Sequence, residues 1–249
     1  WRDEIPSYLI DRKNEIEEVE DLGTDKQPDL ETILNLRPDL ILGPLWNPDV
    51  YPLLSRIAPT VMDRSESTGN DNWRRHFALD AEVLNKKDVA QQAWNFYYQR
   101  IETLKSDLGN QYNDKTISIM TVAYDFENNA SSKNSFIGSV FEDVGLQLAE
   151  SQNVTSRGGW IQFSSENFVD FFDGDILFAT ITGDADRRKL EELQNDSFWK
   201  KLKAVQKGNV YVVDSLTWQG GNLLAANVII DDLYQYLVKN QEQGLLPAS

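Results

Sequence analysis

Aromatic and arginine side chains follow several short apolar stretches of this 249-residue chain, at the point where each stretch ends. These side chains are Trp46, Arg64, Tyr124, Arg187 and Trp218. A guanidinium group binds carboxylate-type oxygens through parallel hydrogen bonds, and an aromatic ring covers a flat or apolar surface. Together they predict a binding site for a ligand with anionic oxygens and a bulky or flat face. Taken singly, each has a plainer reading, because a lone Trp often packs and a lone Arg is often solvated.

Strands must position these side chains if they are to meet. The apolar stretches at 39–43, 60–62, 116–125, 175–181 and 209–214 predict strands, and helical patterns at 29–36, 50–57, 135–151 and 221–239 lie among them. This alternation predicts an α/β fold with mainly parallel sheets. In open α/β sheets, ligands bind outside the carboxyl ends of the strands. We therefore expect the five side chains to line a shared cleft.

The longest helical pattern predicts how the cleft is built. Apolar residues recur at helical spacing at Val89, Ala93, Tyr97, Ile101, Leu104 and Leu108, and Gly109 is a suitable stop. A helix over 87–109 is about 33 Å long, enough to join two small lobes. We expect an N-terminal lobe over 1–86, this interdomain helix, and a C-terminal lobe over 110–249.

Two glutamates occupy matching places on either side of the long helix. Glu31 begins a helix before the strand at 39–43, and Glu166 begins a helix before the strand at 175–181. An acid in the first turn gains ~0.3–1 kcal/mol from the helix dipole, which explains each glutamate alone. It does not explain why matching units place one on each lobe.

Composition excludes several classes of function. Forty acidic against 24 basic residues give a net charge of −16, which argues against binding to nucleic acid. There is no Cys and one His, so thiolate chemistry and a multi-imidazole metal site are excluded. His76 lies in a helical pattern without a nucleophile in a recognisable context, so a packing or surface role is expected. No nucleotide-binding, hydrolase or metalloprotease motif occurs, and an enzyme is not expected.

Several motifs resemble those of one family. "GTDKQPDLETILNLRPDLIL", "FSSENFVDFFDGDILFA" and "FWKKLKAVQKGNVYVVDSLTWQGGNLLAANVIIDDL" are similar to segments of cluster A (class III) periplasmic substrate-binding proteins of ABC importers. The resemblance implies two lobes joined by one long helix, with the ligand between them. It also implies that Glu31 and Glu166 dock onto a permease dimer. "SRGGWIQFSSE" is similar to a stretch of the cobalamin-binding member, which adds Trp160 and Arg157 to the expected ligand site.

The resemblance also implies the ligand and the location. "DVYPLLSRIAPTVM" is closer to the branch that binds hydroxamate or citrate-hydroxamate iron chelates, so a ferric siderophore is expected. The siderophore would hold the iron with its own oxygens, and no cofactor or protein-held metal is expected. Cobalamin, haem and a non-transport sensor on the same fold are the alternatives. We expect a monomer at the bacterial periplasm or cell-envelope exterior. The family's opening strand and helix are missing before Trp1, so either the N-terminus is trimmed or the first lobe is incomplete.

Overall fold

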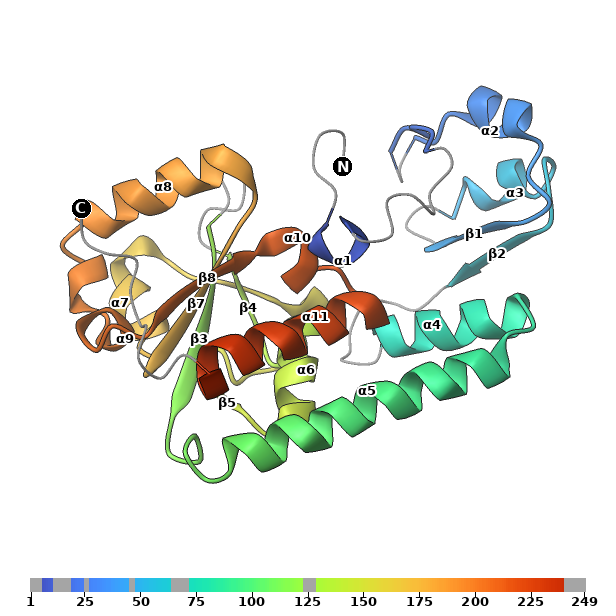
Figure 1. Cartoon of the computed structure of the whole chain (residues 1–249). Helices are drawn as coiled ribbons and strands as arrows, with labels where there is room; N and C mark the ends of the chain where they lie inside the picture. The colour runs from blue at the N-terminus through green and yellow to red at the C-terminus, as the bar shows by residue number, and fades with distance from the viewer. Residues whose placement is uncertain are drawn as a thin grey trace.

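A computed structural model of the chain describes residues 6–10, 19–24, 27–44, 48–63, 72–122 and 129–239. Within these ranges two lobes lie at opposite ends of the long helix α5 (Lys87–Leu108) (Figure 1). A four-residue helix, α1 (Ser7–Ile10), lies between them, beside α10 (Ser215–Trp218) and α11 (Leu223–Leu233). The described helices include none that is long and apolar enough to cross a membrane.

Helix α5 covers the predicted range. Its buried face contains Tyr97, Ile101 and Leu104, and it ends at Gly109, whose N–H donates to the Lys105 carbonyl at 3.0 Å. The expected inward position of Val89 is wrong, because that side chain is 58 % exposed and Ala90 is buried instead. Successive residues of a helix point about 100° apart, so near the start of α5 the buried position falls one residue later than the predicted one.

The N-terminal lobe is small in the part that the structure describes. It contains α2 (Leu30–Leu36), α3 (Tyr51–Leu54) and the parallel strands β1 (Ile41–Pro44) and β2 (Thr60–Asp63), all near their predicted positions. Asp29 caps α2 by accepting from the backbone N–H groups of Glu31 and Thr32, both at 3.1 Å. The hydrogen bonds that the Asp29 carboxylate accepts lower its pKa, chiefly the one from the Thr32 N–H.

Helix α4 (Asn72–Val83) joins the two lobes alongside α5, a role that the sequence did not indicate. Its first turn packs into the C-terminal lobe, where Trp73 is buried and its Nε1 donates to Ser139 Oγ at 3.0 Å. Asp143 accepts from Arg74 at 2.5 Å and from the Tyr97 hydroxyl at 2.6 Å. Burial and the Asp143 carboxylate raise the pKa of Tyr97. The two lobes are thus held by two helices rather than one.

The C-terminal lobe is built on one mixed sheet. Its described strands are β3 (Thr116–Thr121), β4 (Asn129–Ser131), β5 (Gln147–Leu148), β6 (Trp160–Gln162), β7 (Ile176–Ile181) and β8 (Val210–Asp214). The order is β6-β4-β3-β7-β8, with β5 also paired to β3. The β3–β5, β3–β7 and β7–β8 pairs are parallel, and β4 runs antiparallel to β3 and β6. The predicted α/β class with mainly parallel pairing is confirmed.

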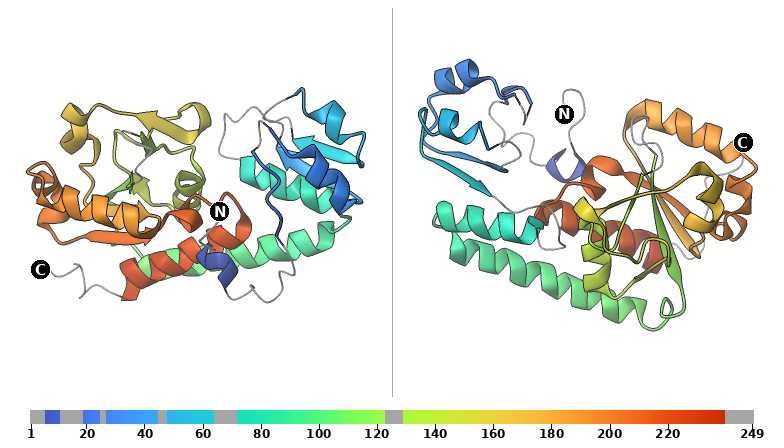
Figure 2. Two further views of the ribbon diagram at one scale, coloured as in Figure 1. Left: turned by 90° about the horizontal axis from the view of Figure 1, so that it is seen from above. Right: turned by 180° about the vertical axis from the view of Figure 1, so that it is seen from behind.

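Helices cover both faces of this sheet (Figures 1 and 2). One face packs against α5, α6 (Phe136–Val144) and α11, which runs on into the π-helical turn η5 (Tyr234–Lys239). The other packs against α7 (Phe168–Phe171), α8 (Gly183–Asn195), α9 (Lys203–Gln206) and the 3₁₀ turn η4 (Trp199–Lys201). The predicted helix over 135–151 is too long, because Gly145 takes a φ of 83° and turns the chain into β5.

Candidate functional site

Three of the predicted cleft residues, Trp46, Arg64 and Tyr124, lie outside the described residues. The strands that precede them are described, and β1, β2 and β3 end at Pro44, Asp63 and Thr121. The role of these three residues therefore stays a prediction.

Trp218 is a core residue, and its predicted place in the ligand site is corrected. The side chain is 0 % exposed, and its ring centroid lies 4.7 Å from that of Phe178 and 5.9 Å from that of Phe141. Strand β8 leads directly into α10, whose turn folds the indole back onto the sheet. The next residue, Gln219, is half-buried and donates to Ser215 Oγ at 2.9 Å and to Thr121 Oγ1 at 3.4 Å.

A half-buried carboxyl group accompanies Trp218. The indole Nε1 donates to Asp232 Oδ2 at 2.7 Å. Burial raises the pKa of Asp232 to about 6, with further increases from Asp231 and Asp214, although the indole hydrogen bond acts in the opposite direction. Desolvation thus outweighs the single hydrogen bond, and this acid titrates in a range where solvent-exposed aspartates are already ionised.

Trp160 and Arg157 lie together at the β6 edge of the sheet. Trp160 is half-buried and pairs with Ser131 of β4, whereas Arg157 is exposed in the 3₁₀ turn η2 (Arg157–Gly159). Of the two glycines between them, Gly159 is required, since a Cβ there would lie 2.8 Å from the Ser135 Cα and its φ is 81°. Ser135 caps α6, so this glycine lets β6 approach the start of that helix.

Arg187 lies on α8, an element that the sequence analysis did not predict. Its side chain is exposed, while the adjacent Asp186 is buried and accepts from the Thr182 N–H at 2.7 Å. Arg187 therefore lies on a different element of the C-terminal lobe from Arg157 and Trp160.

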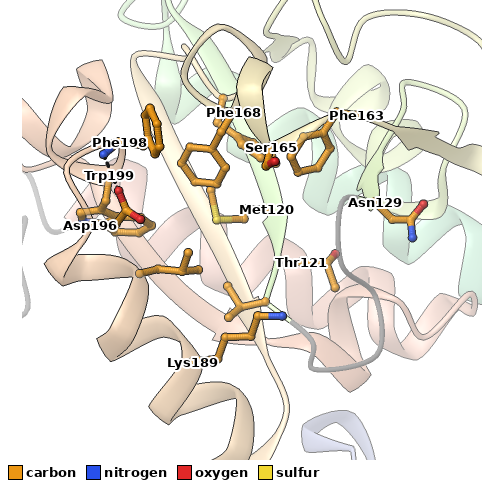
Figure 3. Close-up of a pocket in the computed structure, with 13 residues that line it drawn as sticks. Met120, Thr121, Asn129, Phe163, Ser165, Phe168, Lys189, Asp196, Phe198 and Trp199 are labelled. Carbon is orange, nitrogen blue, oxygen red and sulfur yellow. Dashed lines mark hydrogen bonds between the residues drawn. The ribbon is translucent and has the colours of Figure 1, made fainter.

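Beside α7 and α8 lies a hollow with a volume of about 380 Å³, and Arg157, Trp160 and Arg187 are not among its lining residues (Figure 3). Its aromatic lining consists of Phe163, Phe168, Phe172, Phe198 and Trp199. Its polar lining consists of Thr121, Asn129, Ser165, Lys189 and Asp196. Figure 3 shows Phe163, Phe168 and Phe198 along one side of the hollow and Lys189 on the other, with Met120 between them. Such a lining suits an apolar group inserted from the surface, with polar partners at its margin.

The hollow was not predicted from the sequence, although a signal was present. The segment 163–172, "FSSENFVDFF", contains four phenylalanines around one short helix. Phe172 is buried, whereas Phe163, Phe168 and Phe171 keep part of their surface exposed. The four-residue helix α7 and the turn before it carry more aromatic surface than the helix can bury. Phe163 and Phe168, which stay partly exposed, form one side of the hollow.

Glu31 and Glu166 both occupy the expected first turns. Glu31 is exposed in the first turn of α2, and Glu166 is exposed in the 3₁₀ turn η3 (Ser165–Asn167) that leads into α7. One lies on each lobe, as expected from the paired units. The adjoining residue Ser165 lines the hollow, so the second glutamate lies at its edge.

The described residues contain no group of three or more His, Cys, Asp or Glu side chains that could hold a metal ion. His76 instead lies on α4, where its Nε2 is 3.2 Å from Asp63 Oδ2 at the end of β2. This contact connects the N-terminal sheet to the helix beneath it.

Comparison with known proteins identifies the family. The periplasmic binding protein family model matches residues 6–217, and the chain therefore belongs to this family, whose members bind solutes for transport and are not enzymes. The chain is 32 % identical over 240 residues to the probable siderophore-binding lipoprotein YfiY of Bacillus subtilis strain 168, covering 92 % of this chain and 72 % of that protein.

Two further similarities extend this result. The chain is 31 % identical to the Fe(3+)-citrate-binding protein YfmC of the same organism, covering 79 % of this chain and 60 % of that protein. Its fold matches that of Staphylococcus aureus SirA complexed with staphyloferrin B, with a TM-score of 0.73 at 24 % identity, over 93 % of this chain and 81 % of that one. The predicted two-lobed architecture is confirmed.

Proposed function

We propose that the protein captures a ferric siderophore of the hydroxamate or citrate-hydroxamate type and delivers it to the permease of an ABC importer. The observation that carries the proposal is the 240-residue match to a probable siderophore-binding lipoprotein. The protein acts as a monomer on the outer side of the cytoplasmic membrane, in keeping with the periplasmic and lipoprotein names of its relatives.

The chemistry of the chain suits this cargo. Ferric iron in a siderophore is already held by hard oxygen ligands, so the protein needs no metal-binding side chains of its own. Recognition is then directed at the outside of the chelate. Arg64, Arg157 and Arg187 supply guanidinium groups for its anionic oxygens, and Trp46, Tyr124 and Trp160 supply rings for its apolar parts.

Delivery depends on the two exposed glutamates. Glu31 and Glu166 each present an exposed carboxylate, one from each lobe. A two-fold symmetric permease binds this pair with one cationic side chain from each of its subunits. Exposed charges of this kind steer and orient a partner, so their loss is expected to affect docking and not chelate binding.

Reversing both charges tests this proposal. Glu31→Lys combined with Glu166→Lys is expected to abolish uptake in proteoliposomes that contain the transporter, with the chelate affinity unchanged. The matched control is Asp88→Lys with Glu102→Lys, which makes the same charge change on α5, on the side of the molecule away from α2 and α8 (Figure 1). Normal uptake by the first variant would leave only the helix-dipole explanation for Glu31 and Glu166.

A further inference from the structure

The aromatic hollow is continuous with the turn that carries Glu166. Ser165 and Phe168 both line the hollow, and Glu166 stands between them in sequence, in a 3₁₀ turn of three residues. A cation that reaches the Glu166 carboxylate thus arrives at the edge of an apolar cavity. The two features form one surface, with a charged part and an apolar part.

The surroundings of the hollow favour a partner that is cationic as well as apolar. Glu166, Asp170 and Asp196 are exposed carboxylates on η3, on α7 and at the end of α8. Asp196 also lines the hollow and accepts from the Phe198 N–H at 2.8 Å, which fixes the backbone that presents that ring. Lys189 is the basic member of the lining, on the α8 side.

The exposure of Phe198 favours a partner that covers the hollow. Its side chain is 44 % exposed, and the Lys201 ammonium group lies 5.2 Å from the ring centroid. Leaving apolar surface in water costs about 25 cal/mol per Å², and a ring that a partner covers regains this free energy. Interface hot spots typically combine such an aromatic pocket with a surrounding polar rim.

We propose that this hollow receives an apolar side chain from the same permease loop that brings a cation to Glu166. The inference rests on the proposed function and adds a second contact to the docking surface of the C-terminal lobe. In this account the carboxylate orients the loop, and the apolar side chain, seated against Phe168 and Phe198, supplies most of the local affinity.

A small-molecule ligand is the competing occupant, because cavities of about this volume also bind small molecules. The permease side chain is favoured by two observations. The hollow shares its edge with the docking turn, and Phe198 at its margin is too exposed for a ring whose role is to enclose a small ligand.

Two alanine substitutions and one matched control test the proposal. Phe168→Ala removes part of the wall, and Phe198→Ala removes the exposed ring with little consequence for folding. Phe96→Ala is the control, since Phe96 is 57 % exposed on α5 and likewise lies near a cation, with Arg100 Cζ 5.8 Å from its ring centroid. The binding of each chelate-loaded variant to the cognate permease in lipid nanodiscs is measured, together with its chelate affinity and its thermal midpoint.

The expected result is a ~5- to 30-fold weaker affinity of Phe198→Ala and Phe168→Ala for the permease, with chelate affinity unchanged and less than a ~2-fold effect of Phe96→Ala. Wild-type permease affinity in both hollow variants would overturn the proposal. So would a tenfold loss of chelate affinity in Phe198→Ala, which would assign the hollow to the chelate site. A small molecule retained by the purified protein in native mass spectrometry, and lost in Phe168→Ala, would overturn it as well.

Glu166→Lys, measured in the same assay, separates this inference from the proposed function. If Glu166→Lys abolishes permease binding and the alanine variants bind normally, the hollow has no docking role and the proposed function stands. If Glu166→Lys binds normally while the alanine variants are weakened, the hollow docks the permease and the assigned role of the glutamate fails.

Discussion

The two lobes differ in how much core they contain within the described residues. The N-terminal lobe has a cluster of three buried apolar side chains, Ile33, Val50 and Leu54, and every residue of β2 is only half-buried. In the C-terminal lobe all six residues of β7 are buried, and a separate core covers each face of the sheet. Because burial of apolar surface dominates folding stability, the C-terminal lobe is the more stable part of the described chain.

This difference shows how the smaller lobe is held in position. Helices α4 and α5 extend beneath the N-terminal sheet, and their other ends are fixed in the C-terminal lobe by Trp73, Tyr97 and Asp143. The N-terminal lobe is thus supported by elements whose stability comes from its neighbour. The orientation of a ligand cleft between the lobes then depends on this junction rather than on the small N-terminal core.

The largest effect is expected for the C-terminal core. Trp218→Ala should lower the free energy of unfolding by ~3–5 kcal/mol, because it deletes a fully buried indole packed on Phe178. Urea unfolding followed by far-UV circular dichroism measures this loss. A change below ~1 kcal/mol would show that the indole is not a core residue, and would return Trp218 to the ligand site.

A smaller effect is expected for the N-terminal core. Ile33→Ala should cost ~2 kcal/mol, the low end for such a truncation, because a cluster of three buried side chains beside half-buried strands can collapse around the gap. The protection of β1 and β2 amides from hydrogen exchange should fall, with that of β7 unchanged. Equal loss of protection in both sheets would contradict the comparison between the lobes.

The smallest effect is expected at Asp232 and depends on pH. Since the pKa of Asp232 in the folded protein is about 6 against an ordinary value of 3.8, the folded state binds this proton more tightly than the unfolded state. Its contribution to stability is therefore fully present below about pH 4 and is lost as the pH rises through about 6. Asp232→Asn keeps an acceptor for the Trp218 indole without the charge, and should stabilise the protein by ~1–2 kcal/mol at pH 7.5.

The comparison at two pH values isolates that carboxyl group from the other acids. The stabilisation by Asp232→Asn, measured in urea, should shrink as the pH falls and approach zero near about pH 3, where wild-type Asp232 is mostly protonated in both states. A stabilisation of the same size at both pH values would exclude titration of Asp232 as its cause.

The spacing of apolar residues and the positions of glycine and proline predicted much of the fold. Helix α5 was placed because its apolar residues keep helical spacing up to Gly109, and α2, predicted over 29–36, begins one residue later because Asp29 caps it. The short antiparallel strands β4 and β6 were missed, since three-residue strands carry too little alternation to be recognised. Helix α8 was missed because its sequence is strongly polar.

The candidate site was harder to predict, because side-chain direction is a tertiary property. Trp218 follows a strand just as Trp46 does, but a helical turn after β8 directs its indole into the core. The phenylalanines of 163–172 have the composition of a buried segment, and only the packing of α7 and α8 shows which of them remain accessible. Arg157 and Arg187 were chosen as site residues because of their residue type, but the sequence did not show that they lie on different elements, η2 and α8.

The binding of a ferric chelate is the most direct test of the proposed function. The full chain is titrated with ferric hydroxamate and citrate-hydroxamate siderophores, the same siderophores without iron, haem and cobalamin, with tryptophan emission followed and each hit confirmed by calorimetry. Saturable binding of one ferric hydroxamate-type chelate with a sub-micromolar Kd, and at least tenfold weaker binding of its iron-free form, is the predicted result. Binding of haem or cobalamin alone would contradict the assigned ligand, and the absence of binding to every member of the panel would contradict a role in chelate transport.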